Sequence, residues 1–215
     1  GVRLSVAEHL DACINAGIVP WVPSRGSLGA SGDLAPSAHL VLAMMGEGEL
    51  LTEDGRREPS GPALQAAGLA PVSLEAKEGL SLLNGTQFMA AIGCMLVADG
   101  EALLDSADLI GAMSLEALTG TKAPFDERLH ELRPFKGSKL VAQRLRLLLH
   151  DSDIMQSHID CGRVQDPYSL RCMPQVHGAS RNAWLHLKEL TGIELNAVTD
   201  NPIILGADDT ISGGN

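Results

Sequence analysis

Aromatic residues and basic residues are both scarce in this sequence. Phe, Trp and Tyr make up 3% of its 215 residues. β-Sandwiches and β-barrels rely on aromatic and β-branched side chains, so this scarcity, beside abundant Leu and Ala, favours helices. Lys and Arg number 16 against 27 Asp and Glu, which gives a formal net charge of −11. The chain therefore lacks the basic surface that binding to nucleic acid or an anionic membrane would need.

The sequence also lacks paired cysteines, histidine metal motifs, internal repeats and long apolar runs. Its 4 cysteines form no CxxC pair, and no HxxxH or HExxH pattern occurs. Unpaired cysteines are typical of reduced thiols, so we expect a cytoplasmic protein with no metal site. The longest apolar run, Phe88–Ala98, stops at Asp99 and is too short to cross a bilayer. These absences exclude a disulfide scaffold and predict no membrane partner.

Apolar residues recur at helical spacing along most of the chain. The pattern predicts helices over Val2–Gly17, Ser37–Met45, Pro62–Gly68, Leu74–Leu118, Ser138–Asp153 and Pro174–Gly192. Ser138 is expected to cap its helix, and Gly192 to end the last one. Leu74–Leu118 is expected to form one or two long buried helices. A glycine inside a helix costs about 1 kcal/mol relative to alanine, so the glycines in this range predict close helix approaches or breaks.

The remaining segments predict loops and a small amount of strand. Pro20–Pro36 has no periodicity, and Leu50–Pro59 holds Asp54-Gly55 between short flanks, which is typical of a hairpin. Residues 193–215 are expected to be extended or turn. The predicted fold class is therefore mainly all-α, a long helical bundle over 74–192 with a loop at 26–36. We expect residues 1–215 to be a single piece of a longer chain.

The loop Gly26–Pro36 has an unusual composition. It lacks the GK[ST] of a phosphate-binding loop, the GxGxxG spacing and the GxSxG of a nucleophile elbow. A flexible surface turn is the simplest interpretation of such a glycine- and serine-rich segment. Ala30-Ser31-Gly32 also permits a backbone cyclisation, in which the Gly32 nitrogen attacks the Ala30 carbonyl carbon without crowding from a Cβ. Loss of water and of the Ser31 hydroxyl would then give the electrophile 4-methylideneimidazol-5-one (MIO).

This loop resembles the prosthetic-group loop of the aromatic amino acid ammonia-lyases. Three further stretches resemble family signatures in the same order and at similar intervals: Leu83–Gln87, Val164–Val176 and Asn196–Pro202. The resemblance covers essentially the whole chain. It implies a fumarase–aspartase-like helical bundle and an MIO group formed autocatalytically from Ala30, Ser31 and Gly32, without metal or nucleotide. It also implies a homotetramer whose active sites combine residues from several subunits.

Two features make the chain look most like the histidine branch of that family. They are Gln87 after Asn-Gly-Thr, and Arg171-Cys172 before Pro-Gln-Val. The resemblance then implies elimination of ammonia from L-histidine to give trans-urocanate, the first step of histidine degradation. Two alternatives remain open. One is a tyrosine or phenylalanine ammonia-lyase or an aminomutase with the same prosthetic group, and the other is a non-catalytic helical scaffold.

The resemblance also implies roles for individual side chains. Asn84 and Gln165 would donate hydrogen bonds to the ring oxygen of the prosthetic group, and Tyr168 would supply a phenolic hydroxyl. Arg171 would bind the substrate carboxylate, because a guanidinium makes two parallel hydrogen bonds to a carboxylate. The alternatives are ordinary: a surface ion pair for Arg171, a half-buried aromatic for Tyr168, and structural hydrogen bonds for the two amides. Asp33 could handle protons during cyclisation or cap the following helix.

Overall fold

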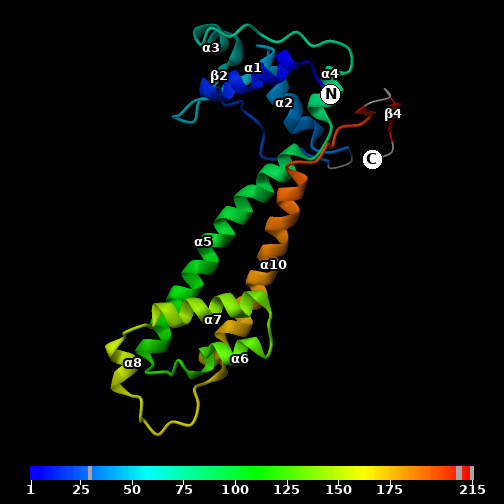
Figure 1. Ribbon diagram of the computed structural model, residues 1–215. Helices are drawn as coiled ribbons and strands as arrows, with labels where there is room; N and C mark the ends of the chain where they lie inside the picture. Colours follow the sequence, from blue (N-terminus) through cyan, green and yellow to red (C-terminus); the bar gives the residue numbers. More distant parts are fainter. Residues whose placement is uncertain (29–30, 207–209, 214–215) are drawn as a thin grey trace. The chain divides into compact units, whose positions relative to one another are not determined.

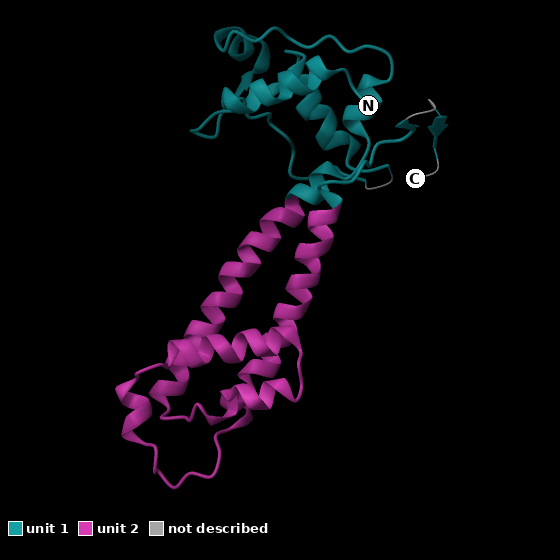
Figure 2. Ribbon diagram, viewed as in Figure 1, with its two compact units in different colours: residues 1–91, 194–215 teal, residues 92–193 magenta. Residues whose placement is uncertain are grey.

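The chain forms two compact units, each of which is described by itself. The structure is a computed structural model that describes all residues except 29–30, 207–209 and 214–215 (Figure 1). The first unit contains residues 1–91 and 194–215, and the second contains residues 92–193 (Figure 2). Helix α5 begins in the first unit and continues into the second. Helices are the main regular elements of the chain, which confirms the predicted fold class.

The first unit combines short helices with two antiparallel hairpins. In β1–β2 Leu50 pairs with Glu58, and in β3–β4 Ile204 pairs with Ile211. The first hairpin was predicted, whereas the second lies in the segment expected to be extended or turn. The elements of the unit are α1 (Leu4–Asn15), α2 (Leu34–Met44), β1 (Glu49–Leu51), β2 (Arg57–Pro59), α3 (Ser60–Ala66), α4 (Glu78–Leu83), β3 (Ile203–Leu205) and β4 (Thr210–Ser212).

The second unit is helical throughout its regular elements. Its hydrophobic core lies between the end of α5 and the helices that follow. The elements are α5 (Gln87–Ala117), η1 (Ala123–Phe125), α6 (Glu127–Glu131), α7 (Lys136–Leu148), α8 (Asp153–Ser157), α9 (Tyr168–Arg171) and α10 (Met173–Glu194). The buried core residues are Ala112, Leu115, Phe125, Val141, Ala142, Leu145, Leu149, Met155, Leu170 and Met173.

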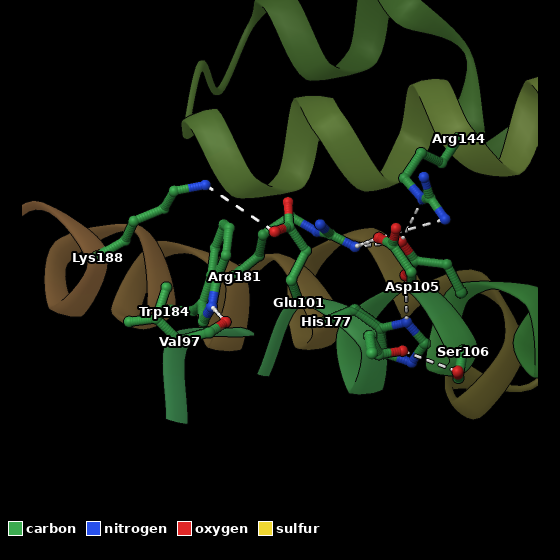
Figure 3. A network of polar contacts seen from close by, with 11 residues as sticks. Val97, Glu101, Asp105, Ser106, Arg144, His177, Arg181, Trp184 and Lys188 are labelled. Carbon is green, nitrogen blue, oxygen red and sulfur yellow. Dashed lines mark hydrogen bonds and ion pairs between the residues drawn. The ribbon is translucent and has the colours of Figure 1, made fainter. Parts of the chain in front are cut away.

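A buried polar network joins α5, α7 and α10 (Figure 3). The fully buried carboxylate of Asp108 accepts hydrogen bonds from Arg181 Nη2 at 2.7 Å, Arg144 Nε at 3.1 Å and His177 Nδ1 at 2.9 Å. Asp105 pairs with both arginines. A buried carboxylate needs such partners because it has lost its water. The network therefore fixes how the three helices meet.

The glycines of Leu74–Leu118 have both predicted roles. Gly85 has φ +118° and breaks the range into α4 and α5. Gly100 and Gly111 lie inside α5 at close approaches, since a Cβ on Gly100 would be 2.8 Å from Trp184 and one on Gly111 would be 2.7 Å from Met173. The expectation of buried helices was wrong for much of α5. Its outer face exposes Met95, Leu103, Ile110 and Met113, because the described residues include nothing that covers it.

Helix α5 is also longer than the apolar run that predicted it, because it continues through Asp99. By length and composition alone it is long and apolar enough to cross a membrane, which differs from the expectation drawn from Phe88–Ala98. A core helix of a soluble protein passes the same test. The ion pairs of Asp105 and Asp108 with α7 and α10 favour packing against other helices.

Several predicted helix boundaries were wrong. Helix α2 begins at Leu34 instead of Ser37, so residues 34–36 of the predicted loop are helical. Ser138 does not cap α7, which begins at Lys136 after Phe135, and Ser138 is buried inside it. The helix begins earlier because Asn182 Oδ1 accepts from the Gly137 N–H at 2.7 Å and so performs the capping from α10. It ends at Leu148, and Asp153 starts α8 instead. Likewise α10 continues past Gly192 to Glu194, since an interior glycine weakens a helix without ending it.

Candidate functional site

The loop around Ser31 and Gly32 lies against the Asn84–Gly85 backbone in the first unit. Gly32 has φ +90° and forms a parallel bridge with Gly85, and the Gly85 N–H donates to Ser31 O at 3.4 Å. A Cβ on Gly32 would lie 1.8 Å from the Gly85 carbonyl oxygen. Glycine is therefore required at position 32 by backbone contact alone. Ser31 is exposed, and Ala30 lies outside the described residues.

This contact fits the prosthetic group that the sequence predicts. Ring closure needs a backbone nitrogen uncrowded by a Cβ at residue 32, and the structure leaves no room for a Cβ there. The exposed Ser31 side chain is accessible. Among the described residues no group of three or more His, Cys, Asp or Glu side chains could hold a metal ion.

The structure does not show one of the two roles expected of Asp33, the capping of α2 by its side chain. Asp33 occupies the N-cap position of α2 but makes no side-chain capping hydrogen bond. Its carboxylate accepts from the Ser27 hydroxyl instead. The capping interpretation was therefore wrong for the side chain, and the proton-handling role stays a prediction.

Three of the sequence stretches meet in the first unit. Asn84 is almost fully buried, and its Nδ2 donates to Asn201 O at 3.2 Å. Thr86 donates through its N–H to Thr199 Oγ1 at 3.4 Å and through its hydroxyl to Glu194. Hydrogen bonds made by residues 84–86 thus connect the stretch 83–87 to two others, 26–36 and 196–202. Sequence reasoning missed the anchoring roles of Thr199 and Glu194, because no local pattern marks a partner about 110 residues away.

An ion pair holds the last of these stretches to the start of α4. The Lys77 ammonium group lies 2.7 Å from Asp200 Oδ2 and lowers the pKa of that carboxyl to about 2. Lys77 Nζ also donates to Pro202 O at 2.6 Å. Because Asp200 directly precedes Asn201, this pair supports the Asn201 carbonyl that accepts from Asn84.

The second unit contains a cavity of about 720 Å³ that Gln165 and Arg171 both line. The Arg171 guanidinium carbon lies 4.0 Å from the centroid of the Tyr168 ring, so the two side chains stack as the i, i+3 spacing of a helical turn predicts. The Tyr168 side chain is exposed. Among the described residues, the buried Arg171 Nε has no hydrogen-bond partner. The surface ion pair considered for Arg171 is thus not observed among the described residues, and Arg171 lines the cavity instead.

Other polar residues of this cavity escaped sequence reasoning. His130, Arg133 and Asn182 line it together with Gln165 and Arg171. They come from α6, the turn after it and α10, so only the packing of these helices brings them together. Nothing in the local sequence around these three residues predicts that they line a common cavity.

The predicted site residues divide between the two units. Ser31, Gly32 and Asn84 lie in the first unit, whereas Gln165, Tyr168 and Arg171 lie in the second. Within each unit the structure brings its own set together. That all of them serve one active site stays a prediction.

The chain is similar to known lyases along its whole length. A family model described as aromatic amino acid lyase matches residues 1–215. A histidine ammonia-lyase from Sorangium cellulosum (strain So ce56) is 55% identical over 100% of this chain and 43% of its own length. Histidine ammonia-lyase from Trypanosoma cruzi gives a TM-score of 0.86 at 39% identity, covering 99% of this chain and 39% of that one. Phenylalanine aminomutase from Pantoea agglomerans gives a TM-score of 0.90 at 30% identity, covering 99% of this chain and 44% of that one. The chain spans about two fifths of the length of the curated relatives it matches.

Proposed function

Because this chain belongs to the aromatic amino acid lyase family, we propose that the complete protein eliminates ammonia from L-histidine to give trans-urocanate. The observation that carries this proposal is the glycine-only contact between Gly32 and Gly85, found in a chain 55% identical to a histidine ammonia-lyase. That identity exceeds the 30% shared with the phenylalanine aminomutase, and so favours histidine as the substrate.

We propose further that Ala30, Ser31 and Gly32 form an MIO group. When formed, this group supplies an electrophile that makes the substrate amine a better leaving group. The Asn84–Gly85 backbone holds the loop in place through the Gly85 N–H and the bridge to Gly32. Asn84 uses its Nδ2 toward Asn201 O, and an amide nitrogen has a second N–H to donate.

In the second unit, Arg171 binds the substrate carboxylate and Tyr168 holds the guanidinium plane by stacking. Gln165 lines the same cavity, and its side-chain amide offers a hydrogen-bond donor to a group bound there. Preorganised donors of this kind are effective because they need no reorientation as charge develops. A phenolic hydroxyl at the site would come from Tyr168, the one tyrosine of the sequence, or from a part of the complete protein outside this chain.

The complete protein is proposed to be a cytoplasmic homotetramer with neither nucleic acid nor a membrane as partner. The exposed apolar faces of α5 and α10, including Leu103, Ile110, Val176 and Ile193, support association with further helices. The free cysteines and the net charge of −11 support the location and the absence of polyanion binding.

The mass of the loop peptide and the turnover of histidine test this function together. In the complete protein, the peptide spanning 26–36 should be lighter by one water for ring closure and one for loss of the Ser31 hydroxyl. Ser31→Ala should lose turnover, because alanine has no hydroxyl to eliminate. Ser24→Ala, an exposed serine just before the loop, is the matched control and should keep both the mass deficit and the activity. Near-normal turnover by Ser31→Ala would contradict the proposal.

A further inference from the structure

Asp166 is a buried carboxylate to which the reaction proposed above assigns no role. It lies between Gln165 and the turn of α9 that carries Tyr168 and Arg171, and its side chain is 1% exposed. Its Oδ2 accepts from the Thr121 N–H at 2.6 Å, and its Oδ1 accepts from Arg163 Nη1 at 3.3 Å. A charge buried this far is tolerated only when such donors compensate for the lost water.

Residues 158–165, which precede Asp166, also form hydrogen bonds to the turn at the C-terminal end of α5. Arg163 Nη1 donates to Leu118 O at 3.4 Å and to Thr119 O at 3.3 Å. His158 Nε2 donates to Gly120 O at 2.7 Å. Leu118 directly follows the last residue of α5, where free carbonyl groups carry partial negative charge that a basic side chain neutralises. Thr119 and Gly120 belong to the turn that follows the helix. Residues 158–166 therefore dock on residues 118–121 through Arg163, His158 and Asp166.

The docking point leaves little freedom at Asp166. A Cβ on Gly120 would lie 3.1 Å from Asp166 Oδ2 and 2.4 Å from Leu115, so the carboxylate fits into space that a glycine leaves open. Of the three docking residues Arg163, His158 and Asp166, Asp166 is the one that itself lines the cavity. Gln165 precedes it directly, and α9 begins two residues after it.

We propose that Asp166 is a positioning residue, whose carboxylate holds the segment 163–171 against the end of α5 and so sets Gln165 and Arg171 in the cavity. The effect of Asp166 on turnover rests on the proposed function, whereas its effect on the order of segment 163–171 does not. Measuring both effects therefore separates the positioning role of Asp166 from the proposed lyase function. A displacement of about 1 Å at a reacting group can cost on the order of a hundredfold in rate.

The test compares Asp166→Ala and Asp166→Asn in the complete protein. Asparagine keeps an acceptor for the Thr121 N–H and loses the charge that faces Arg163, whereas alanine loses both. Hydrogen exchange of the substrate-free protein should be several-fold faster over residues 163–172 in Asp166→Ala, with α7 unchanged, and close to wild type in Asp166→Asn. This readout needs no turnover, so it decides the positioning role even if histidine is not a substrate.

Steady-state kinetics then measure the consequence for the site. Asp166→Ala should lower kcat/KM for L-histidine about a hundredfold, and Asp166→Asn should restore most of it. Inhibition by trans-urocanate, which has a carboxylate, should weaken at least several-fold in Asp166→Ala, whereas inhibition by histamine, which has none, should be unchanged. Asp126→Ala is the matched control, because that carboxylate also accepts from a backbone N–H and an arginine, both of Arg128. It should leave exchange over 163–172 and the kinetic constants within twofold of wild type.

Three results would overturn the proposal. The first is wild-type exchange over 163–172 together with wild-type kinetics in Asp166→Ala. The second is faster exchange spread through α7 that Asp166→Asn does not rescue, which would make Asp166 a general support of the core. The third is an equal loss of urocanate and histamine binding. An inactive wild-type protein with the expected exchange pattern would contradict only the histidine function.

Discussion

Arg171 and Tyr168 show how a single helical turn prepares a binding group. The guanidinium lies 4.0 Å from the tyrosine ring centroid, and its buried Nε has no partner among the residues that the structure describes. Stacking fixes the plane of the guanidinium but leaves its N–H edge free. A planar, oriented fork suits a carboxylate better than a mobile ammonium group does.

This geometry predicts the effect of replacing Arg171. Arg171→Lys keeps the charge but loses the two-point grip and the stacked plane, so kcat/KM for histidine should fall about a hundredfold in the complete protein. Arg171→Gln should lose more, because the charge goes as well. The thermal unfolding midpoint should change little, since the side chain borders a cavity. Steady-state kinetics and thermal unfolding measure the two effects.

Arg128→Lys is the control for this prediction. Arg128 pairs with Asp126 at the surface, and an exposed ion pair contributes little because water screens it. Its kinetic constants should therefore match wild type. An Arg171→Lys variant as active as Arg128→Lys would contradict the carboxylate-binding role.

At the scale of elements, α7 and α10 cross with their backbones in contact. A Cβ on Gly137 would lie 2.1 Å from Gly178 O, and one on Gly178 would lie 2.5 Å from Ser138 N. The Gly137 N–H is bonded to Asn182 from the same crossing. Two glycines thus allow an approach that any larger residue would prevent.

We expect Gly137→Ala to destabilise the complete protein by about 1–3 kcal/mol or more, because backbone atoms on both sides resist the added methyl group. The thermal unfolding midpoint should fall accordingly. Gly192→Ala, near the end of α10, is the matched control, since a Cβ there meets no atom within 4 Å. It should be neutral or stabilising by up to about 1 kcal/mol, the helix preference of alanine. Equal midpoints for the two variants would contradict the backbone contact.

At the scale of the whole molecule, carboxylates with low pKa values predict sensitivity to acid. The Arg3 guanidinium and two backbone N–H groups lower the pKa of Glu78 from 4.5 to about 2. Hydrogen bonds from Arg128 lower the pKa of Asp126 from 3.8 to about 2, and Lys77 does the same for Asp200. A carboxyl group with a lower pKa in the folded state binds protons more readily when unfolded. These groups therefore stabilise the fold fully above about pH 5.

We expect the free energy of unfolding to fall as the pH decreases from about 5 to about 2. Glu78→Gln should lower stability at neutral pH and flatten this decrease, because the amide cannot be protonated in that range. Urea unfolding of this chain across pH measures both effects. Glu53→Gln, at an exposed position in the β1–β2 turn, is the control and should keep the wild-type slope. A Glu78→Gln profile parallel to wild type would contradict the assignment.

The sequence by itself determined the helical class, the first hairpin, the family and the loop that carries Ser31 and Gly32. These features depend on information that is local in the chain. Helical periodicity is set within a few turns, and turn chemistry is set by one or two residues such as Asp54-Gly55. The Gly26–Pro36 stretch can be recognised for the same reason, since its eleven residues are consecutive.

Only the tertiary structure decided which residues support these stretches. Asn182 caps α7 across a helix crossing, Glu194 and Thr199 anchor the Asn84–Thr86 segment, and Asp166 docks on the end of α5. The misplaced α7 boundary has the same cause, because the sequence near Ser138 contains no sign of Asn182. Hydrogen bonds between distant segments form only where packing brings their atoms within about 3 Å, and no local pattern encodes that proximity.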